Sequence, residues 1–120
     1  MGLSVMIVDD SLFTRELLRK QITVAGAEVV VEALDGKEAV ERYDQLKPDL
    51  VFMDFLMRRM NGIEALKAII AKHKDAKIII YTSVSQKIVR KEAMNSGAKA
   101  FVRKPFGENE ILRLVREYTK

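Results

Sequence analysis

The sequence contains no cysteine and no tryptophan, and only two prolines among its 120 residues. The absence of cysteine excludes a disulfide framework and any thiolate metal site. No apolar run approaches the roughly 20 residues that a membrane-spanning helix needs. The start of the chain also lacks the charged, apolar and small-residue zones of a signal peptide. We therefore expect a soluble, cytoplasmic protein with no membrane insertion.

The length and composition are typical of one globular domain over residues 1–120. Hydrophobic residues make up 48% and charged residues 32%, which allows a sizeable core and is too apolar for a disordered chain. The net charge of +4 leaves an acidic partner open, nucleic acid included. The basic residues are spread along the chain, although the richest clusters lie in its C-terminal third, so we expect no direct nucleic-acid binding.

Five short apolar runs alternate with stretches of helical period. The runs predict strands at residues 5–8, 29–31, 50–53, 78–81 and 100–102. They are continuous rather than alternating, which is typical of strands buried on both faces of a parallel sheet. The first helical stripe consists of Phe13, Leu17, Leu18 and Ile22, and four similar stripes follow. This order predicts a doubly wound α/β fold with helices on both faces of a five-stranded parallel sheet.

Polar side chains follow four of the predicted strands. Their positions are Asp9, Asp10, Asp54, Thr82 and Lys104. Ligand sites in parallel α/β sheets lie at the carboxyl ends of the strands, so we expect these groups to meet there. At about 4 Å and an effective dielectric near 20, each pair of carboxylates would repel by on the order of 4 kcal/mol. Such a cluster needs a cation, and oxygen ligands alone favour Mg²⁺.

Each of these residues also has a purely structural interpretation. Asp10 or Ser11 can cap the first helix, and Thr82 or Ser83 can cap the fourth. Because the polar groups at four strand ends have compatible chemistry, a shared site is favoured over four unrelated structural roles. The only histidine, His73, lies near the end of the third helix, where we expect it to face solvent with no role.

Together these residues resemble the receiver domain of two-component response regulators. The resemblance rests on Val8-Asp9-Asp10-Ser11, on Asp54 after an apolar strand, on Met60-Asn61-Gly62, on Thr82-Ser83 and on Lys104-Pro105-Phe106. It covers essentially the whole chain and implies a single, stand-alone receiver domain. It also supplies the flavodoxin-like strand order 2-1-3-4-5, with five helices.

The resemblance implies a role for each residue of the acidic cluster. Asp54 would be the phosphoacceptor, a carboxylate nucleophile that forms an aspartyl-phosphate. Asp10 and Asp54 would hold Mg²⁺ together with the backbone carbonyl of Leu56, and Asp9 would act through a water ligand.

The same resemblance assigns the phosphoryl-binding and switching residues. Lys104 would pair with the phosphoryl oxygens, held toward the site by a cis peptide bond to Pro105. Thr82 would donate a hydrogen bond to the phosphoryl group, and Phe101 would turn inward as the threonine moves.

The resemblance also implies that two positions, variable within the family, control how long the signal lasts. Leu56 and Val84 would flank the approach of water to the phosphoryl group, and their apolar bulk predicts slow loss of phosphate.

The loop after the phosphoacceptor departs from the family. It reads Met57-Arg58-Arg59-Met60, where a proline usually follows the methionine. We expect the loss of that proline to loosen the loop that carries the Leu56 carbonyl. The two arginines would compete with Mg²⁺, attract a phosphorylated donor, or simply point into solvent.

We expect a signalling switch rather than a classical enzyme, one that catalyses only its own phosphorylation and dephosphorylation. A sensor histidine kinase would phosphorylate Asp54. The surface of the fourth helix, fifth strand and fifth helix, with its basic residues, would then control a downstream protein target. The alternative within signalling is a phosphorelay intermediate that passes the phosphoryl group to another protein's histidine.

Functions of other classes fail at particular residues. A phosphatase of the haloacid dehalogenase type needs a second aspartate two residues after the nucleophile, where this chain has Leu56. A flavin-binding domain needs a phosphate loop after the first strand, where Asp9 and Asp10 would repel phosphate. A DNA-binding module would need a helix-turn-helix segment, which is absent from the sequence.

Overall fold

The computed structural model describes residues 2–83 and 86–119, in which five strands alternate with five helices. The elements in chain order are β1 (Ser4–Val8), α1 (Leu12–Val24), β2 (Glu28–Ala33), α2 (Gly36–Leu46), β3 (Leu50–Asp54), α3 (Gly62–Lys72), β4 (Ile78–Thr82), α4 (Lys87–Asn95), β5 (Ala100–Arg103) and α5 (Glu108–Glu117). None of the helices among these described residues is long and apolar enough to cross a membrane.

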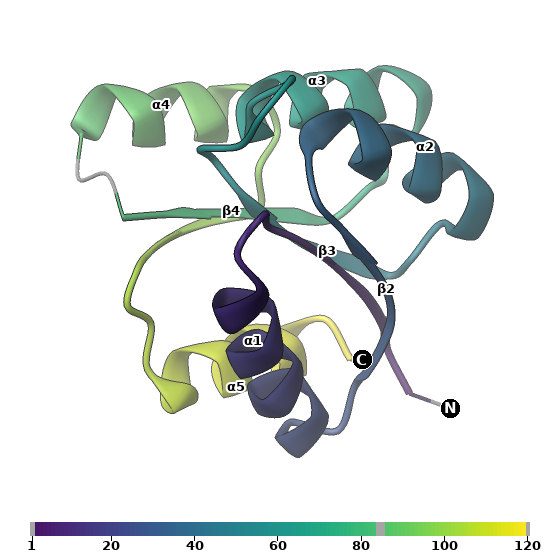
Figure 1. The fold of residues 1–120 in the computed structure, drawn as a ribbon, viewed down its shortest axis with the longest axis vertical. Helices are drawn as coiled ribbons and strands as arrows, with labels where there is room; N and C mark the ends of the chain where they lie inside the picture. The colour runs from purple at the N-terminus through teal and green to yellow at the C-terminus, as the bar shows by residue number, and fades with distance from the viewer. Residues whose placement is uncertain (1, 84–85, 120) are drawn as a thin grey trace.

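The strands form one parallel sheet in the order β2-β1-β3-β4-β5, as predicted. Helices α1 and α5 cover one face of the sheet, and α2, α3 and α4 cover the other (Figure 1). Because every strand runs in the same direction, all five carboxyl ends lie at one edge of the sheet. This topology brings the predicted site residues to the same side of the molecule.

The core lies in two layers, one on each face of the sheet. Every residue of the central strands β3 and β4 is buried, which confirms the interpretation of their continuous apolar runs. The edge strand β2 differs, since Glu28 and Val30 are exposed. An edge strand has a neighbour on one side only, so the helices leave part of it uncovered.

The apolar stripe predicted for α1 is only half right. Leu18 and Ile22 are buried as expected, together with Gln21, whereas Phe13 is 76% exposed and Leu17 is 40% exposed. Helix α1 packs against α5 and the sheet along the buried line of residues, whereas Leu17 lines an open groove between α1 and α5 and Phe13 faces solvent. The exposed residues therefore do not serve the core.

Helix ends decide between the structural and functional interpretations of the strand-end residues. The Ser11 hydroxyl accepts a hydrogen bond from the Thr14 N–H at 3.3 Å, so Ser11, one of the two predicted candidates, caps α1. Helix α4 has Gln86 at its N-cap, with no side-chain cap bond. Because Gln86 occupies the N-cap position, neither Ser83 nor Thr82, the last residue of β4, caps α4.

The expectation that His73 faces solvent is wrong. Its side chain is half-buried, with Nε2 at 2.7 Å from Asp44 Oδ1. Its ring centroid lies 5.0 Å from that of Tyr43. The neighbouring helix α2 supplies both partners, so His73 joins α3 to α2 at the end of the sheet away from the acidic cluster.

Candidate functional site

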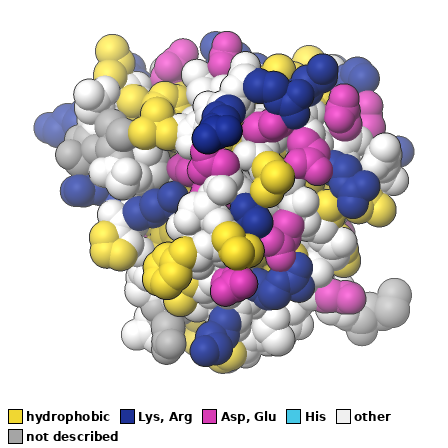
Figure 2. Space-filling view, viewed as in Figure 1, with side chains coloured by type: hydrophobic (Ala, Val, Ile, Leu, Met, Phe, Trp, Pro, Cys, Tyr) yellow, Lys and Arg dark blue, Asp and Glu magenta, His cyan; other side chains and the backbone are white. Residues whose placement is uncertain are grey.

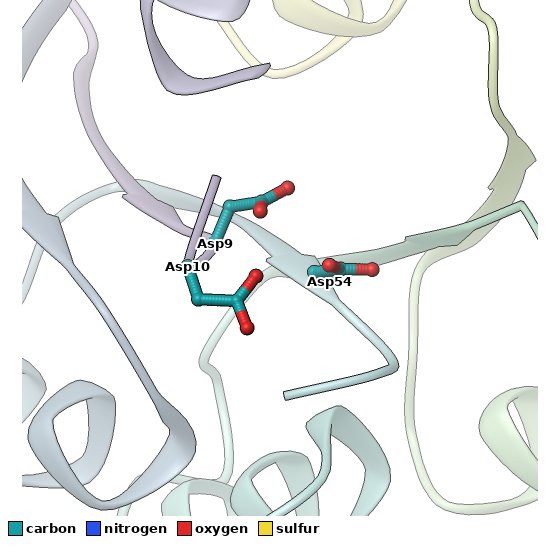
Figure 3. A group of neighbouring side chains, drawn as sticks. All are labelled: Asp9, Asp10 and Asp54. Atoms are coloured by element: carbon teal, nitrogen blue, oxygen red, sulfur yellow. The ribbon is translucent and has the colours of Figure 1, made fainter. Parts of the chain in front are cut away.

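Three carboxylates gather at the carboxyl end of the sheet (Figure 3). Asp9 and Asp10 follow β1, and Asp54 is the last residue of β3. One oxygen from each lies within 4.8 Å of the others, so the structure brings these residues together as the sequence predicts. Asp9 is fully buried and Asp54 is only 5% exposed, whereas Asp10 is open to solvent.

A close backbone approach holds the end of β3 against the start of α3. The Gly62 N–H donates to the Phe55 carbonyl at 2.8 Å. A side-chain carbon on Gly62 would lie 2.3 Å from the carbonyl oxygen of Asp54, well inside van der Waals contact. Only glycine fits there, so Gly62 keeps Asp54 in position next to the loop that follows it.

Lys104 provides the positive charge beside two of the carboxylates. Its Nζ lies 3.2 Å from Asp9 Oδ2 and 3.4 Å from Asp54 Oδ2. Its backbone N–H donates to the Thr82 carbonyl at 2.9 Å, and the peptide bond to Pro105 is cis, as predicted. One lysine is therefore shared between Asp9 and Asp54.

The charge balance of the site still favours a further cation. Burial, with a smaller contribution from the charge of Asp9, raises the pKa of Asp54 to about 6, although Lys104 and the Leu56 N–H act in the opposite direction. The ligand atoms that the three aspartates offer to a metal are all carboxylate oxygens, and Asp10 is accessible to water. These residues fit the hard, partly hydrated ion Mg²⁺.

The remaining predicted residues lie around this cluster. Thr82 is buried at the end of β4, and Phe101 in β5 is half-buried, with the Arg90 guanidinium 5.9 Å from its ring centroid. Leu56 is 52% exposed, so its side chain does not pack into the core. Val84 lies outside the described residues. The roles assigned to these positions stay predictions.

A site residue that the sequence analysis missed is Tyr81. This tyrosine is fully buried in β4, yet its hydroxyl donates to Asp9 Oδ2 at 2.8 Å. In the sequence it is the last of four residues in an apolar run, where the ring fits the strand pattern and the hydroxyl adds nothing to that pattern. A tyrosine in a strand predicted to be buried is a signal that could have identified it, because a buried tyrosine hydroxyl needs a hydrogen-bond partner.

The two arginines after Asp54 behave differently. The Arg59 Nε and Nη2 donate to Asp35 Oδ2 at 2.8 and 2.6 Å, and Asp35 is the N-cap of α2. Arg59 has a left-handed backbone with φ of 66°. Arg58 is exposed and lines a hollow with Asp10 and Asp35. Arg59 is thus exposed but tied to the start of α2 by its ion pair with Asp35. The interpretation that both arginines simply point into solvent holds for the exposure of Arg59 but leaves out this contact.

The Arg59–Asp35 pair is expected to steady the loop that lacks the usual proline. Replacing Arg59 by alanine should weaken Mg²⁺ binding about two- to fivefold, because an exposed ion pair contributes up to about 1 kcal/mol. Isothermal titration calorimetry measures the affinity. Asp35→Ala should have a similar effect, and the double variant should be no weaker than either single one, since both changes break the same contact. Full additivity would show that the two residues act separately.

A doubly wound parallel sheet with three carboxylates and a lysine at one edge defines a class of α/β proteins with an acidic cation site. Residues 5–116 match the family model of the response regulator receiver domain. The chain is 45% identical over 120 residues to the chemotaxis protein CheY of Thermotoga maritima, covering all of both chains. It is 39% identical over 113 residues to CheY of Bacillus subtilis, covering 94% of each. The chain therefore belongs to the response regulator receiver family of two-component systems.

Solved structures agree with this assignment. The CheX–CheY–BeF₃–Mg²⁺ complex of Borrelia burgdorferi contains a chain that superposes with a TM-score of 0.92 at 33% identity, over 98% of this chain and 90% of that one. The response regulator domain of Thermotoga maritima CheB gives a TM-score of 0.89 at 36% identity, over 98% and 96% of the two chains. Receiver domains are signalling domains that bind Mg²⁺ at an acidic pocket.

Proposed function

We propose that Asp54 accepts a phosphoryl group from a histidine kinase, with Mg²⁺ present, and that phosphorylation changes the surface of α4, β5 and α5. The observation that carries this proposal is the position of Asp54: nearly buried, within reach of Lys104, and grouped with Asp9 and Asp10. Such a site works by positioning and charge neutralisation, which is the main requirement of phosphoryl transfer.

In this proposal an oxygen of Asp54 attacks the phosphorus of a phosphohistidine, and the phosphorus–nitrogen bond breaks as the imidazole leaves. Asp10, Asp54 and the Leu56 carbonyl would hold Mg²⁺, with Asp9 acting through water. When bound, the ion neutralises charge on the carboxylates and on the incoming group. Lys104 moves from the carboxylates to the phosphoryl oxygens, and Thr82 donates a hydrogen bond to one of them.

Surface features support protein partners at both steps. Leu12 and Phe13, at the start of α1, are 59% and 76% exposed close to the acidic cluster, which suits a docking phosphodonor domain. The proposed output surface exposes Lys87, Lys91, Lys99 and Arg103. On the face that Figure 2 shows, lysine and arginine side chains are interspersed with acidic ones, which favours protein partners over nucleic acid.

Intact-mass measurement after incubation with acetyl phosphate and Mg²⁺ tests the proposal. We expect one phosphoryl group per chain, and none when a chelator removes the metal. Without the metal, Asp9, Asp10 and Asp54 would repel the incoming phosphate. Labelling that continues in the chelator, or no labelling at all by acetyl phosphate or a phosphorylated kinase, would contradict it.

The phosphorylated state is expected to lose its phosphate slowly. Leu56 has no group that can orient water, so Leu56→Asn should shorten the lifetime severalfold, and Leu56→Asn with Val84→Glu should shorten it further. Phosphate release after donor removal measures the rate. Leu46→Asn is a matched control, since Leu46 is 47% exposed at the end of α2 and Leu56 is 52% exposed. Equal decay of the double variant and the parent would show that access of water does not limit the reaction.

A further inference from the structure

The Tyr81 side chain contacts two of the charged groups of the site, Asp9 and Lys104. Its hydroxyl lies 2.8 Å from Asp9 Oδ2 and 3.3 Å from the Val8 carbonyl oxygen, so Asp9 is the closer acceptor. The Lys104 Nζ lies 5.0 Å from the ring centroid, and the Phe106 ring packs edge-on at 5.5 Å. Burial and the charge of Asp9 raise the pKa of Tyr81 well above its usual value, so the hydroxyl stays a donor at neutral pH.

Asp9 depends on its hydrogen-bond donors because it is fully buried. Its Oδ1 accepts from the Ser11 N–H at 2.8 Å. Its Oδ2 accepts from the Tyr81 hydroxyl at 2.8 Å and from Lys104 Nζ at 3.2 Å. Three of about four acceptor positions of the carboxylate are therefore used, and these contacts fix its orientation.

The two donors on Asp9 Oδ2 differ in what else they contact. Lys104 is also 3.4 Å from Asp54 Oδ2, so it is shared, whereas the Tyr81 hydroxyl lies against Asp9 Oδ2 and the Val8 carbonyl oxygen. When Lys104 turns to a phosphoryl group on Asp54, the Tyr81 hydroxyl is the donor left on Asp9 Oδ2. A buried carboxylate that lost both hydrogen-bond donors on one oxygen would be destabilised by the full desolvation penalty of that oxygen.

We propose that Tyr81 is a positioning residue of the acidic site: its hydroxyl holds the Asp9 carboxylate oriented toward the metal position, and so leaves Lys104 available to Asp54. This inference rests on the proposed function of the site. Hydrogen-bond partners of metal-binding carboxylates fix the orientation of the ligand, and their loss typically lowers metal affinity about 10- to 100-fold. Asp9 is expected to act through water, so the effect here should be smaller.

Tyr81→Phe removes only the hydroxyl and keeps the ring that packs on Phe106. We expect the dissociation constant for Mg²⁺, measured by calorimetry, to rise about three- to tenfold. The increase in melting temperature that Mg²⁺ causes should shrink accordingly, because that increase depends on the affinity. Labelling by acetyl phosphate should slow at limiting Mg²⁺ and recover as Mg²⁺ approaches saturation.

Tyr43→Phe is the matched control, since it removes another tyrosine hydroxyl from a residue only 6% exposed, at the opposite end of the sheet. Its Mg²⁺ affinity should equal that of the parent. A Tyr81→Phe variant that binds Mg²⁺ within twofold of the parent would overturn the inference and leave the proposed function intact if the parent is labelled. An equal loss in Tyr43→Phe would also overturn it. If the parent neither binds Mg²⁺ nor takes up a phosphoryl group, both the inference and the proposed function are wrong.

Discussion

Asparagine in place of Asp54 is expected to abolish phosphorylation and, at the same time, to make the metal-free protein more stable at neutral pH. The first effect follows because the amide lacks the anionic oxygen that attacks phosphorus. The second follows because Asp54 is 5% exposed and lies beside the buried carboxylate of Asp9, so its negative charge is unfavourable without a cation. One substitution should thus abolish phosphorylation and stabilise the metal-free folded protein at neutral pH.

The pH dependence of this stabilisation has a defined sign. Burial and the charge of Asp9 raise the pKa of Asp54 from 3.8 to about 6 in the folded protein. Between these two values the folded state binds more protons than the unfolded state, so stability falls as the pH rises through this window and stays lower above it. Asparagine does not titrate. The variant should therefore be more stable than the parent by about 1–3 kcal/mol near neutral pH, and the difference should vanish below about pH 4.

Thermal or urea unfolding in the presence of a chelator, at several pH values, measures this difference. Asp44→Asn is an instructive control because the hydrogen bond with His73, together with that from Lys72, lowers the pKa of Asp44. Loss of that carboxylate should therefore reduce stability at neutral pH. An Asp54→Asn variant that is less stable than the parent at neutral pH would show that the Lys104 contact outweighs burial.

The strand order and the acidic cluster could be predicted because they depend on short-range patterns. A strand such as β3, covered on both faces, needs an unbroken apolar run, and the residue that ends it lies at the ligand edge of the sheet. The positions of Asp9 and Asp54 follow from that rule alone. The order of the strands does not follow from this rule; that expectation came from the resemblance to the receiver family.

The features that could not be predicted depend on contacts between distant segments. The pair of Arg59 and Asp35 joins residues 24 positions apart, and the bond between Tyr81 and Asp9 joins residues 72 positions apart. No local pattern specifies such partners. The spacing of Phe13 fits an apolar helical stripe, yet periodicity says nothing of how far α5 covers α1.

Removing the charge of Lys104 is expected to separate metal binding from phosphoryl transfer. Lys104→Met keeps the length of the side chain but leaves Asp9 and Asp54 without the amine that lies 3.2 and 3.4 Å from them. Breaking a buried ion pair by removing one partner costs on the order of 3–5 kcal/mol. Because the lysine is 23% exposed, we expect a loss of about 2–3 kcal/mol in the metal-free protein at neutral pH. The loss should shrink in acid, where protonation of Asp54 removes one of the two negative charges.

Mg²⁺ should compensate for this loss, since the metal and the lysine supply positive charge to the same carboxylates. We expect Lys104→Met to bind Mg²⁺ about tenfold more tightly than the parent, as removal of a competing cation favours the ion by 1–2 kcal/mol. Labelling by acetyl phosphate should nevertheless slow, because the phosphoryl oxygens lose their cationic partner. Calorimetry, melting with and without Mg²⁺, and intact-mass kinetics measure the three effects. Lys99→Met is the control, since this exposed lysine precedes β5. Weaker Mg²⁺ binding by Lys104→Met would mean that the lysine organises the carboxylates for the metal rather than competing with it.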